Sequence, residues 1–163
     1  QLLRLAQVEG YEVDALERAD LHAIAVEVAT MMAPLAARQA KTIEVIGPSA
    51  PLIVAGNANL MTLAVRNLVD NGLQHTPTGG GVEISLDPEG GITVTDQGPG
   101  IPKELREHVF RRFWRGARDT GGNAGLGLSI VERCVQICGG DVTIADAANG
   151  GAVITIRLPT PTS

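Results

Sequence analysis

Residues 66–76 read RNLVDNGLQHT, and they end a stretch that has the apolar spacing of a buried helix. Asn67 and Asn71 are four residues apart, so a helix places them on one face, one turn apart. Asn disfavours helices because its amide competes for backbone hydrogen bonds, and Gly72 costs about 1 kcal/mol relative to Ala. The sequence therefore predicts a helix that gives up stability and aligns two amides.

The composition is that of one globular domain. The chain has 163 residues, enough for one sizeable core and hardly enough for two. Hydrophobic residues make up 44% and aromatic residues 2%, so aliphatic side chains must build the core. A net charge of −5 argues against a nucleic-acid or membrane-surface partner, which needs a basic surface. No apolar run approaches the roughly 20 residues of a membrane span.

Two cysteines, Cys134 and Cys138, lie four residues apart on one expected helix. Neither has a further Cys or a His at metal-ligand spacing. We expect free thiols in the core, which are typical of a reducing, cytoplasmic compartment.

Hydrophobic periodicity predicts helices and strands in separate runs, which is typical of an α+β layer with helices on one face of the sheet. Asp20 is expected to cap the second helix, and Pro34 to kink or restart it. Residues 111–124 have no periodicity and are expected to form a loop. The expected helices cover residues 1–9, 21–40, about 59–76, 102–109 and 126–138, and the strands cover 41–47, 51–56, 82–87, 91–96, 141–146 and 152–159.

The segment TVTDQGPGIP, residues 93–102, places Asp96 at the end of a strand, before Gly98 and Gly100. A carboxylate fixed there accepts a hydrogen bond from an exocyclic amine, and glycines allow a ligand to approach the backbone. Taken alone, the motif also fits an ordinary turn with an incidental Asp.

A second glycine motif, GGNAGLGLSIV at residues 121–131, opens a helix at Gly125 and Gly127. Unpaired N–H groups at a helix start bind anions, although such glycines are also common without a ligand. It is neither a Walker loop nor a dinucleotide fingerprint. On the amide helix, Asn71 offers a neutral oxygen suited to Mg²⁺. The alternative for that stripe is a hydrogen-bonded core network or an exposed face.

Five segments in order resemble the catalytic, ATP-binding domain of sensor histidine kinases: RNLVDNGLQHTP, VTDQGPGIP, VFRRFWR, AGLGLSIV and GGAVITIRLP. That family belongs to the nucleotide-binding superfamily of Hsp90, DNA gyrase and the mismatch-repair ATPases. The resemblance implies a two-layer α/β sandwich of the Bergerat type, with a mixed, mostly antiparallel sheet, helices on one face and a mobile ATP lid. It divides the chain into the tail of a second dimerisation helix (1–10), a linker (11–19), the catalytic domain (20–160) and a C-terminal tail (161–163).

Site roles follow from the resemblance. It implies that Asn71 ligates Mg²⁺, that Asn67 reaches the phosphates, that Asp96 anchors adenine and that Thr155 supports Asp96, often through water. Phe110 and Phe113 resemble the aromatic residues that fasten the start of the lid. The implied ATP-binding set is Asn67, Asn71, Gln74, His75, Asp96, Gly98, Gly100, Ile101, Phe110, Arg115, Gly125, Leu126, Gly127, Leu128 and Thr155.

The resemblance also implies a function. Relatives that hydrolyse ATP carry a Glu where this chain has Asn67, and an amide cannot take a proton, so ATP is held for transfer to a histidine. His22, His75 and His108 lack the sequence context of the receiving histidine, so this chain is expected to contain no catalytic histidine. The implied partners are the protein's own dimerisation and phosphoacceptor domain and a response-regulator receiver domain. We expect the cytoplasmic part of a membrane-anchored sensor, with no nucleic-acid or direct membrane contact.

Three departures from the family pattern leave other functions open. Gln74 stands where Lys or Arg is usual, Asn123 replaces the first lid glycine, and Gly72 replaces the commoner Ala. Lid arginines such as Arg115 are candidates to supply the missing charge. The alternatives are a serine kinase of the anti-sigma-factor type and a nucleotide-binding regulatory module that transfers no phosphate.

Overall fold

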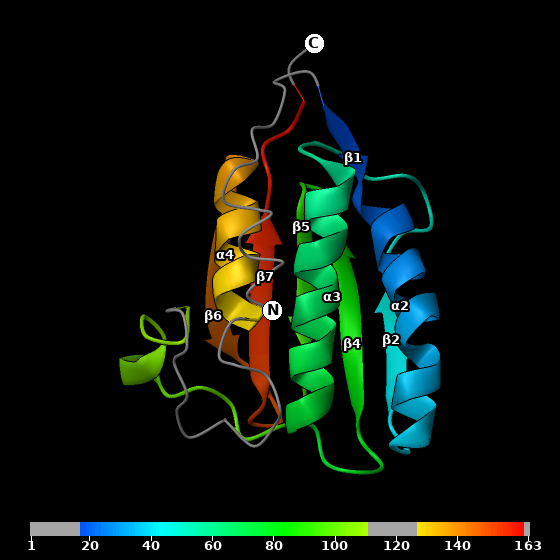
Figure 1. Ribbon diagram of the computed structural model, residues 1–163, viewed down its shortest axis with the longest axis vertical. Coiled ribbons are helices and arrows are strands. Elements are labelled where there is room, and N and C mark those ends of the chain that lie inside the picture. Colours follow the sequence, from blue (N-terminus) through cyan, green and yellow to red (C-terminus); the bar gives the residue numbers. More distant parts are fainter. Residues whose placement is uncertain (1–16, 111–126, 162–163) are drawn as a thin grey trace.

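The computed structural model describes residues 17–110 and 127–161, in which helices cover one face of a five-stranded sheet (Figure 1). This arrangement confirms the predicted two-layer α+β class. The helices are α2 (Leu21–Arg38), α3 (Ala58–His75), α4 (Gly127–Ile137) and the short 3₁₀ helix η1 (Lys103–Leu105). The strands are β1 (Arg18–Asp20), β2 (Thr42–Ile46), β3 (Ile53–Ala55), β4 (Gly81–Asp87), β5 (Gly91–Thr95), β6 (Asp141–Asp146) and β7 (Ala152–Arg157).

The strands of the main sheet follow the order β2-β4-β5-β7-β6. Tight turns join β4 to β5 and β6 to β7, so these pairs are antiparallel, as is the central pair β5–β7. β2 and β4 are parallel, because the chain between them passes through β3 and α3. The sheet is therefore mixed and mostly antiparallel, as expected.

Alternation along the strands gives the sheet one buried and one open face. Ile84 on β4, Ile92 on β5 and Ile156 on β7 are buried beneath the helices. On the opposite face, the neighbouring residues Thr93 and Thr155 are half-buried, and their hydroxyl oxygens lie 2.9 Å apart. The helix-free face is thus partly polar.

Helix α3 lies between α2 and α4 and packs on both (Figure 1). Gly56, just before α3, lies beside Cys138, just after α4: a Cβ on Gly56 would lie 3.5 Å from the Cys138 side chain. The two helices therefore run antiparallel. The C-terminal end of α3 and the N-terminal end of α4 meet at the same end of the domain, where two of the expected ligand motifs lie.

Three local expectations differ from the structure. Pro34 does not start a new helix, because α2 runs through it to Arg38. It lies on the exposed face of α2, where a carbonyl that loses its backbone donor is open to water. Of residues 102–109, Lys103–Leu105 form a 3₁₀ turn and no α-helix. Finally, Arg18 and Ala19, expected at the end of the linker, pair with β3 as part of β1, which ends at the helix cap Asp20.

Helix α2 also meets the length and composition of a membrane-crossing helix, with 18 residues and a mean hydropathy of 1.2. One third of it is buried inside the domain, where it packs against α3 and β2. Core helices of this kind meet the same criteria, and here the apolar face of α2 has its partners within the fold.

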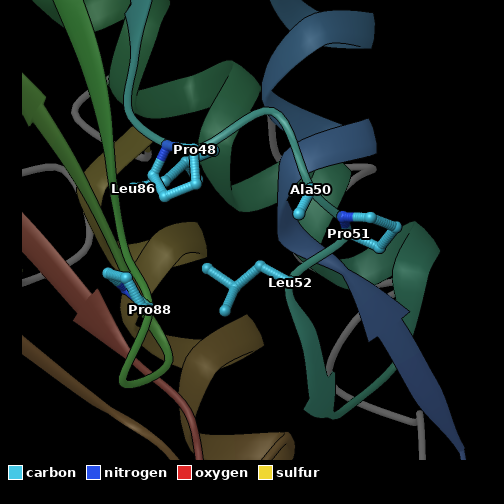
Figure 2. A pocket seen from close by; sticks show the side chains of 6 residues that line it. All are labelled: Pro48, Ala50, Pro51, Leu52, Leu86 and Pro88. Carbon is cyan, nitrogen blue, oxygen red and sulfur yellow. The ribbon is translucent and has the colours of Figure 1, made fainter.

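An apolar hollow of about 160 Å³ opens between the β2–β3 loop and the β4–β5 turn (Figure 2). Its wall includes Pro48, Leu52 and Pro88. Pro88 precedes β5 and Asp96 follows it, so the hollow lies at the opposite end of the sheet from the Asp96 motif.

The cap of α2 provides a test of the fold. Asp20 Oδ1 accepts hydrogen bonds from the N–H groups of His22, at 3.0 Å, and Ala23, at 3.3 Å, and from Leu52 on the β2–β3 loop, at 3.0 Å. We expect Asp20→Ala to lower the free energy of unfolding by about 2 kcal/mol, because a cap and a tertiary bond are lost together. Urea titration measures the change. Asp20→Asn is the control, since its amide oxygen accepts the same bonds; an equal loss in both variants would contradict this role.

Cys134 and Cys138 are free and buried, as expected. Burial raises the pKa of the Cys134 thiol from 9.0 to about 12, with a smaller contribution from Cys138. Above pH 9 the unfolded thiol loses its proton while the folded thiol keeps it, so folding stability falls as the pH rises towards 12. We expect this thiol to contribute a loss of up to about 1.4 kcal/mol per pH unit. Urea unfolding of wild type and Cys134→Ala at about pH 8 and about pH 10 isolates it. Equal pH dependence in both proteins would refute the assignment.

Candidate functional site

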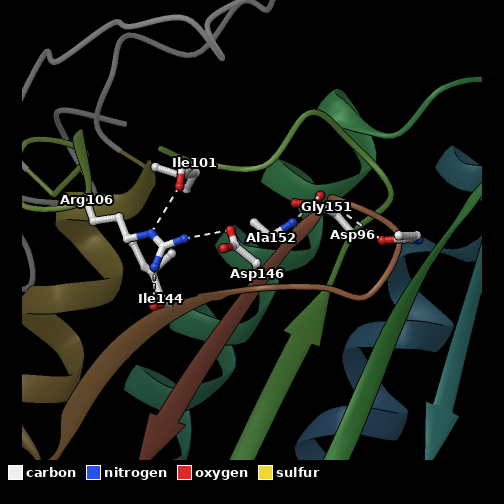
Figure 3. A network of polar contacts seen from close by, with 8 residues as sticks. Asp96, Ile101, Arg106, Ile144, Asp146, Gly151 and Ala152 are labelled. Atoms are coloured by element: carbon white, nitrogen blue, oxygen red, sulfur yellow. Dashed lines mark hydrogen bonds and ion pairs between the residues drawn. The ribbon is translucent and has the colours of Figure 1, made fainter. Parts of the chain in front are cut away.

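The carboxylate of Asp96 is fixed at the end of β5 and is only 3% exposed. Its Oδ1 accepts hydrogen bonds from the backbone N–H of Gly98, at 2.9 Å, and of Ala152, at 3.1 Å (Figure 3). The Asp96 N–H in turn donates to the Ala152 carbonyl at 3.0 Å. Two strands therefore hold this negative charge in one position, because a buried carboxylate needs donors to replace water.

Glycines let three backbone segments meet around Asp96. A Cβ on Gly98 would lie 2.6 Å from the carbonyl oxygen of His75, at the end of α3. A Cβ on Gly151 would lie 2.0 Å from the carbonyl oxygen of Asp96 itself. Gly100 has a φ of +77°, and a Cβ there would lie 2.5 Å from the Gly150 oxygen. No side chain fits at these positions, so the glycines of the motif have a steric role.

The amide stripe of α3 lies at the same corner. Asn67 is 3% exposed, and its Nδ2 donates to the Leu63 carbonyl at 2.8 Å. Asn71 Oδ1 is buried and has no hydrogen-bond partner within residues 17–110 and 127–161. Gly72 allows α3 to approach β5, since a Cβ there would lie 3.1 Å from Val82 and 3.4 Å from the Asp96 Cβ. The helix-weakening Gly72 thus lets this turn of α3 pack closely against Val82 and Asp96.

The next turn of α3 is bonded within the helix. Gln74 Nε2 donates to Asp70 Oδ2 at 3.3 Å, and His75 Nδ1 lies 2.8 Å from the Asn71 carbonyl oxygen. Gln74 is half-buried, and its amide is engaged by its own helix instead of replacing the missing cation.

The remaining expected residues are placed in part. Gly127 and Leu128 are buried at the start of α4, Ile101 is buried after the glycine motif, and Phe110 packs half-buried against the core. Arg115, Gly125, Leu126, Phe113 and Asn123 lie outside the described residues, as does most of the expected lid.

Thr155 does not take the place that the resemblance implied. Its hydroxyl lies beside Thr93 on the face of the sheet opposite the helices. Side chains alternate along β5, so Asp96 lies on the same face as Ile92 and Val94, which is the face that the helices cover. The Asp96 carboxylate is supported instead by the Ala152 N–H, three residues earlier on the same strand. A backbone donor is independent of side-chain identity, so no motif marks it.

Arg106 is a further residue of this region that the sequence did not indicate. Its guanidinium bonds the carbonyls of Ile101 and Ile144 and the carboxylate of Asp146 (Figure 3). Asp146 is forty positions away in sequence, and no local pattern connects the two residues.

The residues present fit a nucleotide with a magnesium ion. A buried amide oxygen without a partner is unfavourable, and Asn71 Oδ1, which has none among the described residues, is an oxygen ligand of the kind that Mg²⁺ accepts. Asp96 has the acceptor oxygens that suit an exocyclic amine, and a helix N-terminus such as that of α4 suits a phosphate.

Together, the fold and this corner define a nucleotide-binding domain of the two-layer ATPase class. The chain belongs to the family of histidine kinase-, DNA gyrase B- and HSP90-like ATPases, whose model matches residues 56–162. Within that family it resembles the catalytic, ATP-binding domain of sensor histidine kinases, the class to which the relatives described next belong.

The relatives and solved structures agree. Hybrid signal transduction histidine kinase D of Dictyostelium discoideum is 40% identical over 77% of this chain and 9% of that protein. Sensor histidine kinase CpxA of Escherichia coli is 40% identical over 76% of this chain and 28% of that protein. The mycobacterial sensor histidine kinase MprB is 31% identical with a TM-score of 0.72, over 90% of this chain and 99% of that structure. The ATP-binding domain of PrrB from Mycobacterium tuberculosis is 26% identical with a TM-score of 0.69, over 91% of this chain and 100% of that structure.

Two neighbouring glycines test the close approach at Asp96. We expect Gly151→Ala to lower the free energy of unfolding by about 3 kcal/mol, because its Cβ would meet the Asp96 backbone, which cannot move aside. Gly150→Ala meets nothing within 4 Å, and at a φ of +92° it should cost only about 1 kcal/mol of backbone strain. Thermal or urea unfolding compares them. A smaller loss for Gly151→Ala than for Gly150→Ala would contradict the packing described.

Proposed function

We propose that this domain holds ATP with Mg²⁺ and presents the γ-phosphate to a histidine on a dimerisation domain. The observation that carries the proposal is the buried Asn71 Oδ1, which has no partner among the described residues and lies on the helix that packs against the Asp96 segment at Gly72. Asn71 ligates the metal, Asn67 and the glycine-opened start of α4 contact the phosphates, and Asp96 accepts the adenine amine.

The Asp96 carboxylate selects the base. Its fixed position offers only acceptor oxygen to the ligand, so it favours the amino group of adenine and disfavours the carbonyl oxygen that guanine carries there. Gly98 and Gly100 let the backbone at His75 and Gly150 pack against this motif, which then shapes the pocket behind the ring.

The amide at Asn67 favours transfer over hydrolysis. It is bonded to its own helix and cannot take a proton from water, so the site lacks a general base at this position. When bound, Mg²⁺ neutralises phosphate charge and favours phosphoryl transfer. The chain's own residues position the nucleotide and keep it until an acceptor arrives.

The partners in this proposal are the protein's own dimerisation and phosphoacceptor domain and a response-regulator receiver domain. The chain spans 9% and 28% of the two curated relatives described above, both of which are named as histidine kinases. It is therefore proposed to be the cytoplasmic ATP-binding part of a larger sensor kinase. The same names favour a histidine acceptor over the serine of an anti-sigma-factor kinase.

One observation favours a regulatory module that binds nucleotide and transfers no phosphate. Gln74 brings no charge to the phosphates, and its amide is bonded to Asp70. Joining the domain to a dimerisation segment and assaying for acid-labile phosphohistidine separates the two functions.

Calorimetric titration with ADP and a non-hydrolysable ATP analogue, with and without Mg²⁺, tests the site. We expect Asp96→Asn to weaken adenine-nucleotide binding by at least about tenfold, because a charged acceptor is lost while its Oδ1 still accepts the backbone bonds. Asn71→Ala should remove the Mg²⁺ dependence. It should leave the free energy of unfolding unchanged or raise it, because the atom removed has no bond within the described residues.

The matched control is Asn57→Ala. Asn57 is a buried asparagine just before α3, and its Oδ1 caps the helix at the Leu60 N–H, at 2.9 Å, at the end far from Asn71. That variant should lose stability and keep Mg²⁺-dependent binding. Wild-type protein that binds no adenine nucleotide, or an Asn71→Ala variant with unchanged Mg²⁺ dependence, would overturn the proposal.

A further inference from the structure

Arg106 makes three hydrogen bonds from one guanidinium, and its side chain is 18% exposed. Nε donates to the Ile101 carbonyl at 3.0 Å, one terminal nitrogen donates to the Ile144 carbonyl at 3.3 Å, and the other donates to Asp146 Oδ1 at 2.7 Å. The rigid fork of Arg thus joins the segment after the glycine motif to the edge strand β6 (Figure 3).

These two segments also form the surroundings of Asp96. Residues 97–101 continue directly from Asp96, and Asp146 is the strand partner of Ala152, whose N–H bonds the Asp96 carboxylate. The backbones of the segments also come close, because a Cβ on Gly100 would lie 2.5 Å from the Gly150 carbonyl oxygen. Asp96 links the two segments through its buried carboxylate, and Arg106 links them through its guanidinium, which is partly exposed.

We propose that Arg106 is a positioning residue for the adenine anchor: its bonds to Ile101, Ile144 and Asp146 hold both segments at the spacing that aligns the Asp96 carboxylate. This inference rests on the proposed adenine contact of Asp96. Arg106 touches no ligand in this role and acts through the Ala152 N–H.

The two carbonyl bonds carry most of this role. Asp146 is 63% exposed, and an ion pair with one solvated partner contributes little. The carbonyls of Ile101 and Ile144 instead lie on two different segments, and one planar group reaches both. Lys keeps the charge but has no fixed fork, so it should replace Arg106 poorly.

The first test needs no nucleotide. Amide hydrogen exchange, followed by NMR, reports directly on the Ala152 and Gly98 N–H groups that bond Asp96. In Arg106→Gln and Arg106→Lys we expect both amides to exchange roughly tenfold faster or more, since each lost bond to a charged group weakens the closed state. In Asp146→Asn, which keeps the carbonyl bonds, the increase should be smaller.

The matched control is Arg157→Gln. Arg157 pairs with Asp87 at 2.9 Å on the same sheet, but at the end away from Asp96. The substitution removes an ion pair on the same sheet and should leave the exchange rates of the Ala152 and Gly98 amides unchanged. Equal acceleration in Arg157→Gln and Arg106→Gln, or no acceleration in Arg106→Gln, would overturn the proposal.

The second test is ADP affinity by calorimetry. Arg106→Gln should weaken ADP binding roughly tenfold with Arg106→Lys close to it, whereas Arg157→Gln binds like wild type. Accelerated exchange with unchanged ADP affinity would also overturn the positioning role. If wild-type protein binds no ADP, the proposed function fails, and the exchange data still decide whether Arg106 holds the Ala152–Asp96 bond.

Discussion

The bonds from the Ala152 and Gly98 amides to the Asp96 carboxylate are the interaction on which the functional end of this domain depends. A carboxylate that is 3% exposed is tolerated because backbone donors replace its water. These donors reach the carboxylate because the segments around His75, Asp96 and Gly150 lie closer together than a Cβ would allow. The glycines at 98, 100 and 151 follow from that requirement, and so does the cost that Gly72 imposes on α3.

The same corner shows how stability is exchanged for binding. Asn71 Oδ1 is buried with no partner in the described parts of the chain, and Gly72 weakens the helix that carries it. At the opposite end of α3, Asn57 is buried with its cap bond made. The N-terminal end of α3 is therefore stabilised by its cap, whereas the turn that carries Asn71 lacks such a bond and keeps an oxygen for a ligand.

Much of this was predictable from sequence because the signals are local. Helical and alternating periodicity predicted the layers, and Asp20 was identified as a cap. The glycines after Asp96 were expected to admit a ligand, whereas in the structure they admit neighbouring backbone. Other features depend on tertiary partners and carry no such signal. The Ala152 donor is a backbone group, the Arg106–Asp146 pair spans forty positions, and β1 exists only because β3 lies beside it. Thr155 was misassigned because a three-residue shift along a strand changes the face on which a side chain lies.

The small β1–β3 pair has a mechanical consequence. β3 pairs with β1, and the N–H of Ala55 on β3 donates to the Pro159 carbonyl. Arg18 and Pro159 therefore lie at the same end of the domain, which we call its pole. Helix α3 begins at this pole and ends at the Asp96 corner, about 27 Å away for 18 residues at the usual helical rise. In the larger sensor kinase proposed above, the domain would be attached at this pole, and the nucleotide site would lie at the opposite end. A rotation of about 20° about the attachment would then move the nucleotide site by about 9 Å.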